Sequence, residues 1–271
     1  MKRLEKKFSE LKSKNQCAFV AYICAGDPDY ATSLEILKLL PEAGCDIIEL
    51  GVPFLDPSGD GPIIENASKR AIANGASLKN TLAMAAEFRE INTATPVLLM
   101  GYYNPFLKYG IDKIFADAEK SGVDGILIVD LPLEERAEIA LAAAKSNIDL
   151  INLVGPLSSE ERIGEIAKVS GGFLYLVSML GITGTKQAAI AANKINLEKI
   201  RKNSSLPVVI GFGIQQPSQA AEFAKIGVDG VVVGSTIVKV IEENVVAKKS
   251  SGEIVAKVLE TVRAFAAAIK L

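Results

Sequence analysis

Residues 44–51 read GCDIIELG, a glycine and an aspartate followed by a short apolar run. The same pattern returns at residues 122–129 (GVDGILIV) and 227–233 (GVDGVVV). Each copy follows a helical pattern. The glycine suits the left-handed position after a helix, and the aspartate can hydrogen-bond the turn that begins the strand. We therefore predict a repeated helix-turn-strand unit, which is typical of a parallel α/β fold.

Short apolar runs alternate with amphipathic stretches along the rest of the chain. We predict eight strands, at 18–24, 46–50, 96–100, 125–129, 149–153, 173–177, 207–211 and 230–233. Helices are expected at 30–43, 62–74, 78–90, 111–121, 133–146, 158–169, 190–203, 216–226, 235–243 and 252–269. Eight parallel strands with intervening helices favour a single (β/α)8 TIM barrel with extra N-terminal and C-terminal helices. An open, doubly wound sheet stays possible, because strand count alone does not prove closure.

Composition limits the possible functions. The chain has 271 residues, 49% of them hydrophobic, which suits one domain covering residues 1–271. Its 30 basic and 32 acidic residues leave no positive excess to hold a nucleic-acid backbone. The N-terminus is charged and amphipathic, and no apolar stretch is long enough to cross a membrane, so we expect a cytoplasmic protein.

The absence of histidine is equally informative, because it excludes His-based triads, His-metal sites and imidazole bases. Cys17, Cys24 and Cys45 form no CxxC pair, and we expect all three to be reduced core residues. Acid-base chemistry must therefore come from carboxylates, tyrosine or lysine, and no metal site is expected.

Glu49 is the first candidate for this chemistry. It lies in an apolar strand, where an ionised and unpaired carboxylate costs several kcal/mol. Burial should raise its pKa toward the range useful for proton transfer at neutral pH. The structural alternative is a glutamate paired with a lysine or arginine across the barrel.

The turn-rich loop that follows, residues 51–62, adds Asp56 and Asp60 close to Glu49. Loops of this length at a barrel mouth are usually functional. The alternative for each aspartate is a turn or helix-capping role, and Asp60 before Gly61-Pro62 fits an N-cap.

Glycines follow the last two predicted strands, at Gly211-Phe212-Gly213 and Gly234-Ser235. In TIM barrels, amides in this region, with a helix beginning at once, form a recurrent phosphate site. Two ordinary tight turns are the alternative. The residues alone thus predict a barrel enzyme that binds a phosphorylated small molecule and uses carboxylates, but they do not name the substrate.

The ordered set of motifs resembles the tryptophan synthase alpha chain family over nearly the whole length. The motifs are Gly26-Asp27-Pro28, the run ELGVPFLDPSGDGP at 49–62, Tyr102 with Asn104-Pro105, Asp130-Leu131-Pro132, GITG at 181–184, GFGI at 211–214 and Gly234-Ser235. The resemblance implies a lyase that splits indole-3-glycerol phosphate into indole and glyceraldehyde 3-phosphate. It implies no cofactor in this chain, and a beta-chain partner carrying pyridoxal phosphate in an α2β2 tetramer.

The resemblance also implies roles for individual residues. Glu49 and Asp60 would be the catalytic pair, with Glu49 moving protons and Asp60 holding the indole N–H. Thr183 would lie on a mobile loop, roughly 178–190, that closes over the substrate and positions Asp60. Substrate would contact Tyr22, Tyr102, Leu127, Tyr175, Thr183 and Phe212, and phosphate would bind the amides of Gly184, Gly213, Gly234 and Ser235. For the aromatic residues, plain core packing is the alternative.

Four positions depart from the family's usual pattern: Leu55, Ser58, Gly59 and Met179. Glu49 and Asp60 themselves match the family pattern, so the expected reaction is unchanged. The four departures bear on loop closure and on coupling to the beta subunit. Two other functions stay open for this reason: a stand-alone lyase that needs no partner, and a barrel kept mainly as an activating subunit.

Overall fold

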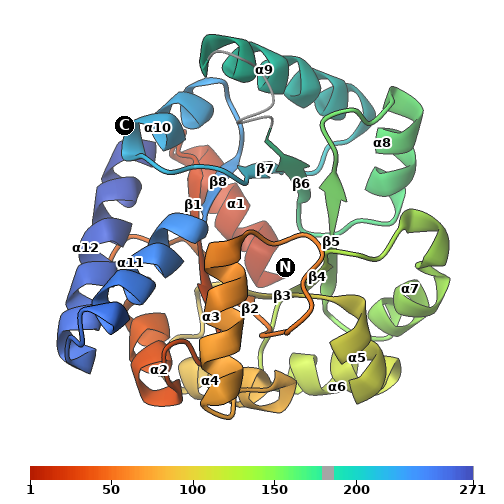
Figure 1. Ribbon diagram of the computed structural model, residues 1–271. Helices are drawn as coiled ribbons and strands as arrows, with labels where there is room; N and C mark the ends of the chain where they lie inside the picture. The colour runs from red at the N-terminus through yellow and green to blue at the C-terminus, as the bar shows by residue number, and fades with distance from the viewer. Residues whose placement is uncertain (179–185, 271) are drawn as a thin grey trace.

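The computed structural model describes residues 1–178 and 186–270, which form a closed barrel surrounded by helices (Figure 1). Eight parallel strands pair in chain order, and β1 also pairs with β8. The strands are β1 (Ala18–Cys24), β2 (Ile47–Gly51), β3 (Val97–Gly101), β4 (Gly125–Ile128), β5 (Asp149–Val154), β6 (Leu174–Val177), β7 (Val208–Gly211) and β8 (Gly230–Val233). The predicted TIM barrel is confirmed, and the open sheet is wrong because the first and last strands meet.

Helices cover the outside of the barrel. They are α1 (Arg3–Ser13), α2 (Tyr30–Leu39), α3 (Pro62–Ala73), α4 (Leu78–Ile91), α5 (Tyr103–Tyr109), α6 (Ile111–Lys120), η1 (Leu133–Glu135), α7 (Ala137–Ala144), α8 (Glu160–Lys168), α9 (Lys186–Asn203), α10 (Pro217–Lys225), α11 (Ser235–Val246) and α12 (Ser251–Ile269). No helix among the described residues is long and apolar enough to cross a bilayer. That residues 1–271 form a single domain stays a prediction.

Helix α5 was not predicted from the sequence, and two other helices differ from the prediction at their starts. Pro105 lies in the first turn of α5, where N–H groups have no partner within the helix, so the proline does not prevent the helix. The N–H of Tyr103 donates to Asp130 at 2.7 Å, which fixes the start of this helix. The helix expected at 133–146 begins as the 3-10 turn η1, and the one expected from residue 190 begins at Lys186.

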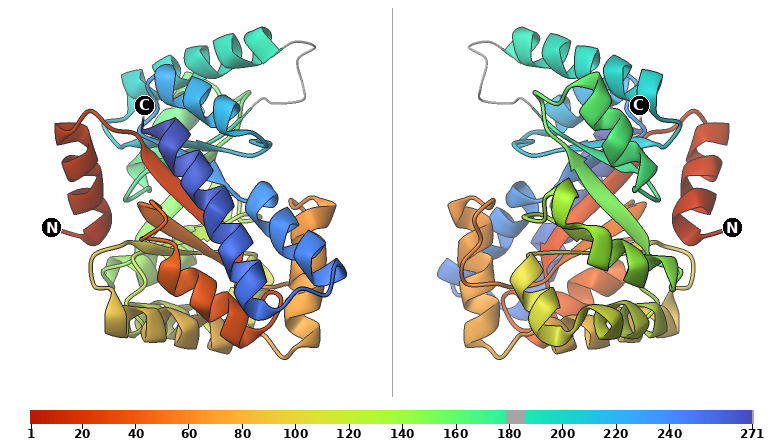
Figure 2. Two further views of the ribbon diagram at one scale, coloured as in Figure 1. Left: turned by 90° about the vertical axis from the view of Figure 1, so that its left-hand side faces the viewer. Right: turned by 90° about the vertical axis from the view of Figure 1, so that its right-hand side faces the viewer.

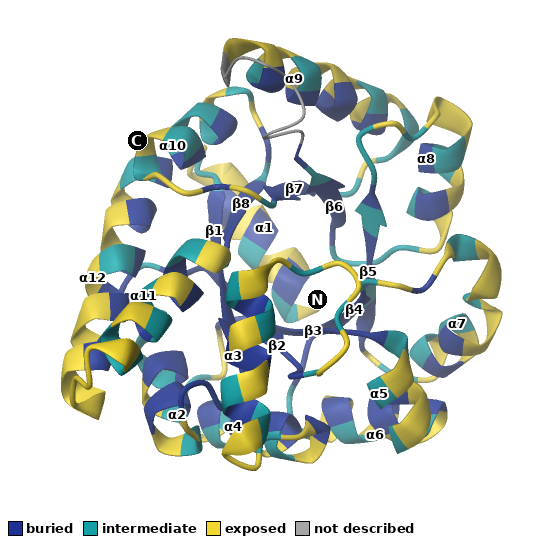
Figure 3. Cartoon of the chain, in the orientation of Figure 1, coloured by how far each residue is buried: buried dark blue, intermediate teal, exposed yellow. Residues whose placement is uncertain are grey.

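The strand residues alternate between two apolar layers, and Figure 3 shows the strands buried and the outer helix faces exposed. In β1, Val20 and Tyr22 point into the barrel interior, whereas Phe19 and Ile23 pack between strands and helices. This period of two follows from the pleat of a strand. It places Glu49 in the interior between two residues of the outer layer, Ile48 and Leu50.

The repeated glycine-aspartate pairs lie at the N-terminal ends of the strands. Gly44, Gly122 and Gly227 have φ values of 99°, 73° and 93°, as expected for left-handed positions. Their aspartates, however, accept hydrogen bonds from the preceding strand: Asp46 from the Phe19 N–H at 2.9 Å, Asp124 from Val97 and Asp229 from Val208, both at 2.8 Å. The prediction that each aspartate serves its own turn was wrong, because the barrel brings an unpaired strand N–H within reach.

Helix α1 closes the N-terminal end of the barrel. Leu4, Phe8 and Leu11 are buried with the interior residues, and the Phe8 and Phe173 ring centroids lie 5.9 Å apart. Figure 2 shows α1 at the end of the barrel opposite α3. Since α1 blocks one end, substrate has to enter from the other, where the strands end.

Candidate active site

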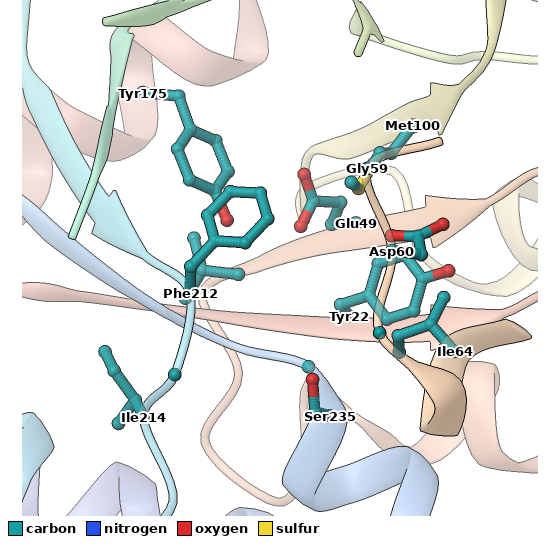
Figure 4. Close-up of a pocket in the computed structure, with 14 residues that line it drawn as sticks. Tyr22, Glu49, Gly59, Asp60, Ile64, Met100, Tyr175, Phe212, Ile214 and Ser235 are labelled. Atoms are coloured by element: carbon teal, nitrogen blue, oxygen red, sulfur yellow. The ribbon is translucent and has the colours of Figure 1, made fainter. Parts of the chain in front are cut away.

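A pocket opens at the C-terminal ends of the strands, where TIM barrels carry their active sites. It has a volume of about 540 Å³ including the part open to solvent. Its lining comprises Tyr22, Glu49, Gly59, Asp60, Gly61, Ile64, Met100, Tyr175, Phe212, Gly213, Ile214, Val232, Gly234 and Ser235. In Figure 4, Glu49 and Asp60 lie on one side of the pocket, and Tyr175 and Phe212 lie on the other.

Glu49 is 1% exposed and stands beside Tyr22 in the β1–β2 register. Below it the interior is apolar, with Leu98, Leu127 and Ile151 among its members. Burial, and secondarily the negative charge of Asp60, raise the pKa of Glu49 to about 8. Among the described residues, no lysine or arginine forms an ion pair with Glu49, so the structural alternative of a partner across the barrel has no support in this part of the chain.

Asp60 lies at the end of the loop between β2 and α3. Its burial raises the pKa of its carboxyl, and a hydrogen bond with the Tyr102 hydroxyl opposes that rise. The N-cap of α3 is Gly61, followed by Pro62 at the first helical position, so the capping alternative for Asp60 is wrong. Its side chain points into the pocket instead (Figure 4). Asp56 is exposed and is not a lining residue.

Tyr22 and Tyr175 occupy their positions because two strand residues beside them are glycines. A Cβ atom on Gly51 would overlap the Tyr22 hydroxyl, and one on Gly211 would overlap the Tyr175 hydroxyl. Burial raises the pKa of both phenols well above the ordinary value, so both are neutral. Phe212 packs edge-on against Tyr175 at 5.6 Å.

The loop after β7 has a strained and well-anchored backbone. Phe212 has a φ of 75°, unusual for a residue with a side chain, and Gly213 has a φ of 73°. The Phe212 carbonyl accepts from the Ser178 hydroxyl at 2.5 Å, and the Ile214 carbonyl accepts from the Thr236 hydroxyl at 3.0 Å. These bonds fix Gly213 close to the first turn of α11, where Gly234 and Ser235 line the pocket.

An ion-pair network joins the elements around the mouth. Arg70 of α3 makes two bonds to the buried Asp27, at 2.8 and 3.0 Å, and one to Glu242 of α11 at 2.9 Å. Asn66 of α3 also donates to Glu242, at 3.0 Å. The helix after Asp60 is thereby tied to the helix that begins at Ser235.

The structure brings most of the predicted site residues into one pocket: Tyr22, Glu49, Asp60, Tyr175, Phe212, Gly213, Gly234 and Ser235. Tyr102 lies behind the Asp60 loop, and Leu127 lies in the interior, so neither lines the pocket. Thr183, Gly184 and Met179 lie outside the described residues, as does most of the predicted closing loop. Leu55 and Ser58 are exposed.

Several lining residues were not predicted. Met100 and Val232 point inward by strand alternation, a signal that the sequence contained. Ile64 and Ile214 each follow a predicted site residue closely, and Gly59 and Gly61 flank Asp60. Only the folded geometry decides which of these neighbours face the pocket.

Comparison with known proteins supports the family resemblance that the sequence motifs indicated. The family described as tryptophan synthase alpha chain matches residues 8–270. The crystal structure of tryptophan synthase subunit alpha from Legionella pneumophila str. Paris is 34% identical, with a TM-score of 0.91, covering 99% of this chain and 98% of that one.

Two structures of tryptophan synthase from M. tuberculosis, one in an open form and one in an aminoacrylate-bound form, are also similar. Each is 31% identical and covers 100% of both chains, with TM-scores of 0.87 and 0.86. The closed eight-stranded barrel agrees with these matches. The chain therefore belongs to the tryptophan synthase alpha chain family.

Proposed function

We propose that Glu49 and Asp60 are the catalytic pair with which this alpha chain carries out its reaction. The chain is a lyase that cleaves indole-3-glycerol phosphate into indole and glyceraldehyde 3-phosphate, as its family does. The observation that carries the proposal is a pair of carboxylates on one side of a pocket whose rim includes Gly213, Gly234 and Ser235. Alpha chains use no cofactor, since the pyridoxal phosphate belongs to the beta subunit.

Glu49 suits both proton transfers of this retro-aldol cleavage. In its acid form it gives a proton to indole C3. The resulting carboxylate then takes the proton of the glycerol hydroxyl as the bond between C3 and the glycerol carbon breaks. The bonding electrons return to the ring, which releases indole and an aldehyde, and Glu49 regains its proton. A pKa of about 8 keeps both forms accessible near neutral pH.

Asp60 would stabilise the positive charge that develops at the ring nitrogen. Its ionised carboxylate can accept a hydrogen bond from the indole N–H, and this bond strengthens as the ring is protonated. Tyr22 and Phe212 would hold the ring, and Tyr175 would lie near the glycerol end of the substrate. The phosphate would bind at the opposite end to the amides of Gly184, Gly213, Gly234 and Ser235. Thr183 would contact the substrate and position Asp60.

We also propose that the working form is an α2β2 tetramer with a tryptophan synthase beta chain, located in the cytoplasm. Solved relatives described as tryptophan synthase, rather than as the alpha subunit alone, support the partnership. Leu55, 57% exposed on the loop that carries Asp60, offers an apolar contact at the mouth.

Replacing Glu49 with glutamine tests the catalytic assignment. Glutamine has nearly the same size but cannot transfer the proton, so indole release should fall by at least about a thousandfold. Binding of glycerol phosphate, measured by calorimetry, should be unchanged because Glu49 lies away from the phosphate site. Glu35→Gln, exposed on α2, is the control and should keep full activity. Substantial turnover by Glu49→Gln would remove Glu49 from its role.

Adding a beta subunit from the same source tests the partnership. Slow indole release by the free chain that the partner strongly accelerates is the expected result. Fast release that the partner leaves unchanged would favour a stand-alone lyase. A free chain with little activity of its own that still activates the beta subunit would favour an activating subunit.

A further inference from the structure

Tyr102 makes three contacts with the loop that carries Asp60. It follows β3 directly and is 3% exposed. Its hydroxyl accepts a hydrogen bond from the Gly59 N–H at 3.1 Å, and its influence on the neighbouring Asp60 carboxyl lowers the pKa of that group. Its ring lies 5.5 Å from that of Phe54, tilted by 32°. The Tyr102 side chain, just after β3, thus contacts the loop near its start at Phe54 and near its end at Gly59.

The loop has few other fixed points. Val52 donates to the Met100 carbonyl at 2.8 Å at one end, and Gly61 caps α3 at the other. Between them, Leu55, Asp56, Ser58 and Gly59 are exposed. Within residues 1–178 and 186–270, the hydrogen bonds of residues 53–60 to the rest of the protein go to the Tyr102 hydroxyl. Among the described residues, the Tyr102 hydroxyl is thus the hydrogen-bonding group that holds this part of the loop.

The hydroxyl can serve Gly59 and Asp60 together because it is both a donor and an acceptor. A lone pair is used by the Gly59 N–H, so the O–H is free to donate to the Asp60 carboxylate. A donated hydrogen bond favours the ionised form of a carboxylate, and it lowers the pKa of Asp60 against the effect of burial. A Cβ at Gly59 would make an ordinary contact with the hydroxyl at 3.5 Å and a tight one with Val129 at 3.2 Å.

We propose that Tyr102 is a positioning residue whose hydroxyl holds the Gly59–Asp60 segment so that the Asp60 carboxylate faces the ring nitrogen of the substrate. Tyr102 does not line the pocket, so this role does not require contact with the indole. The inference rests on the proposed role of Asp60 and assigns to Tyr102 the orientation and ionisation of that group.

Tyr102→Phe separates the hydroxyl from the ring, because phenylalanine keeps the contact with Phe54. We expect kcat to fall roughly ten- to a hundredfold, the range for a hydrogen bond to a charged group, with KM changing less than about threefold. The acidic limb of the kcat profile should move to higher pH, because Asp60 loses its donor. Tyr103→Phe is the matched control, one residue along, and should match the wild type in both readouts.

Three results would overturn the inference. One is a wild-type kcat and pH profile in Tyr102→Phe. Another is a rise in KM alone with an unmoved pH limb, which would assign Tyr102 to substrate contact. The third is a kcat loss with an unmoved limb, which would indicate a merely structural effect. Asp60→Asn separates a failure of the proposed role of Asp60 from a failure of the role of Tyr102. If Asp60→Asn remains active, the proposed function of Asp60 is wrong. If Asp60→Asn is inactive and Tyr102→Phe is normal, only the role of Tyr102 is wrong.

Discussion

At the scale of single residues, the chemistry of this protein depends on a carboxyl group in an apolar interior. The pleat of β2 turns Glu49 inward, between outward-facing Ile48 and Leu50, and the interior below offers leucine and isoleucine side chains. Water that would solvate an ionised carboxylate is excluded there, so the neutral acid is favoured. The same burial that prepares Glu49 to donate a proton costs the fold stability once the group ionises.

This cost predicts how stability depends on pH. Between its ordinary pKa of 4.5 and about 8, the unfolded chain has released the Glu49 proton and the folded chain retains it. The free energy of unfolding therefore falls as pH rises through this window. In urea titrations at pH 5 to 9, Glu49→Gln should become more stable relative to the wild type by up to a few kcal/mol as pH rises. A difference that stays constant with pH would show that Glu49 titrates normally.

At the scale of elements, the site is built where strands pass into loops and helices. The loop after β7 is bonded to Ser178 on one side and to Thr236 of α11 on the other, which stabilises the positive φ of Phe212 and Gly213. Arg70 joins α3 to α11 through Glu242 and to the turn after β1 through Asp27. Helix α3, which follows Asp60, is thus tied to helix α11, whose first turn begins at Gly234 and Ser235.

Gly213 gives a test of the phosphate site. In Gly213→Ala the added methyl group would crowd an amide that we propose binds the phosphate, so KM should rise about tenfold or more with a smaller change in kcat. The left-handed backbone adds a strain of roughly 1–2 kcal/mol. Gly75→Ala carries the same strain, at a φ of 85°, with open space around its Cβ, and should lower stability without changing KM. Equal KM values for the two variants would place the phosphate elsewhere.

At the scale of the whole molecule, the two ends of the barrel have separate tasks. The N-terminal end is closed by α1 and by charged side chains such as Arg3 and Arg89, which both bond to Asp124 at 2.7 Å. The other end carries the pocket. Changes at the closed end should therefore alter stability and leave catalysis intact.

Phe8→Ala tests this division. Removing a buried ring that contacts Phe173 should lower the free energy of unfolding by about 3–5 kcal/mol. At a temperature where the variant is folded, kcat and KM should equal those of the wild type. Ile91→Ala, at an exposed position, should change neither quantity. A large loss of kcat in folded Phe8→Ala would mean that the closed end influences the pocket.

Features that depend on neighbouring residues could be predicted from the sequence, whereas features that depend on distant contacts could not. Alternating apolar residues and glycine-aspartate turns act locally, so the eight parallel strands with intervening helices were predictable from them, and a barrel was the favoured arrangement. The burial of Glu49 was also predictable, because its strand is apolar on both faces. The role of Asp60 could not be predicted in this way, because the local sequence fits a helix N-cap and a catalytic carboxylate equally well. The resemblance to known alpha chains named its role, but its direction into the pocket appears only in the fold.

The tertiary structure decided what depends on contacts between distant parts of the chain. It placed the Tyr102 hydroxyl against Gly59 and Asp60, and it paired Arg70 with Asp27. It also turned the aspartates of the repeat toward neighbouring strands. The sequence by itself determined the alternation of strands and helices and the residue types available for chemistry. Only closure of the barrel brought those residues together, because the geometry of eight paired strands sets distances that no local pattern encodes.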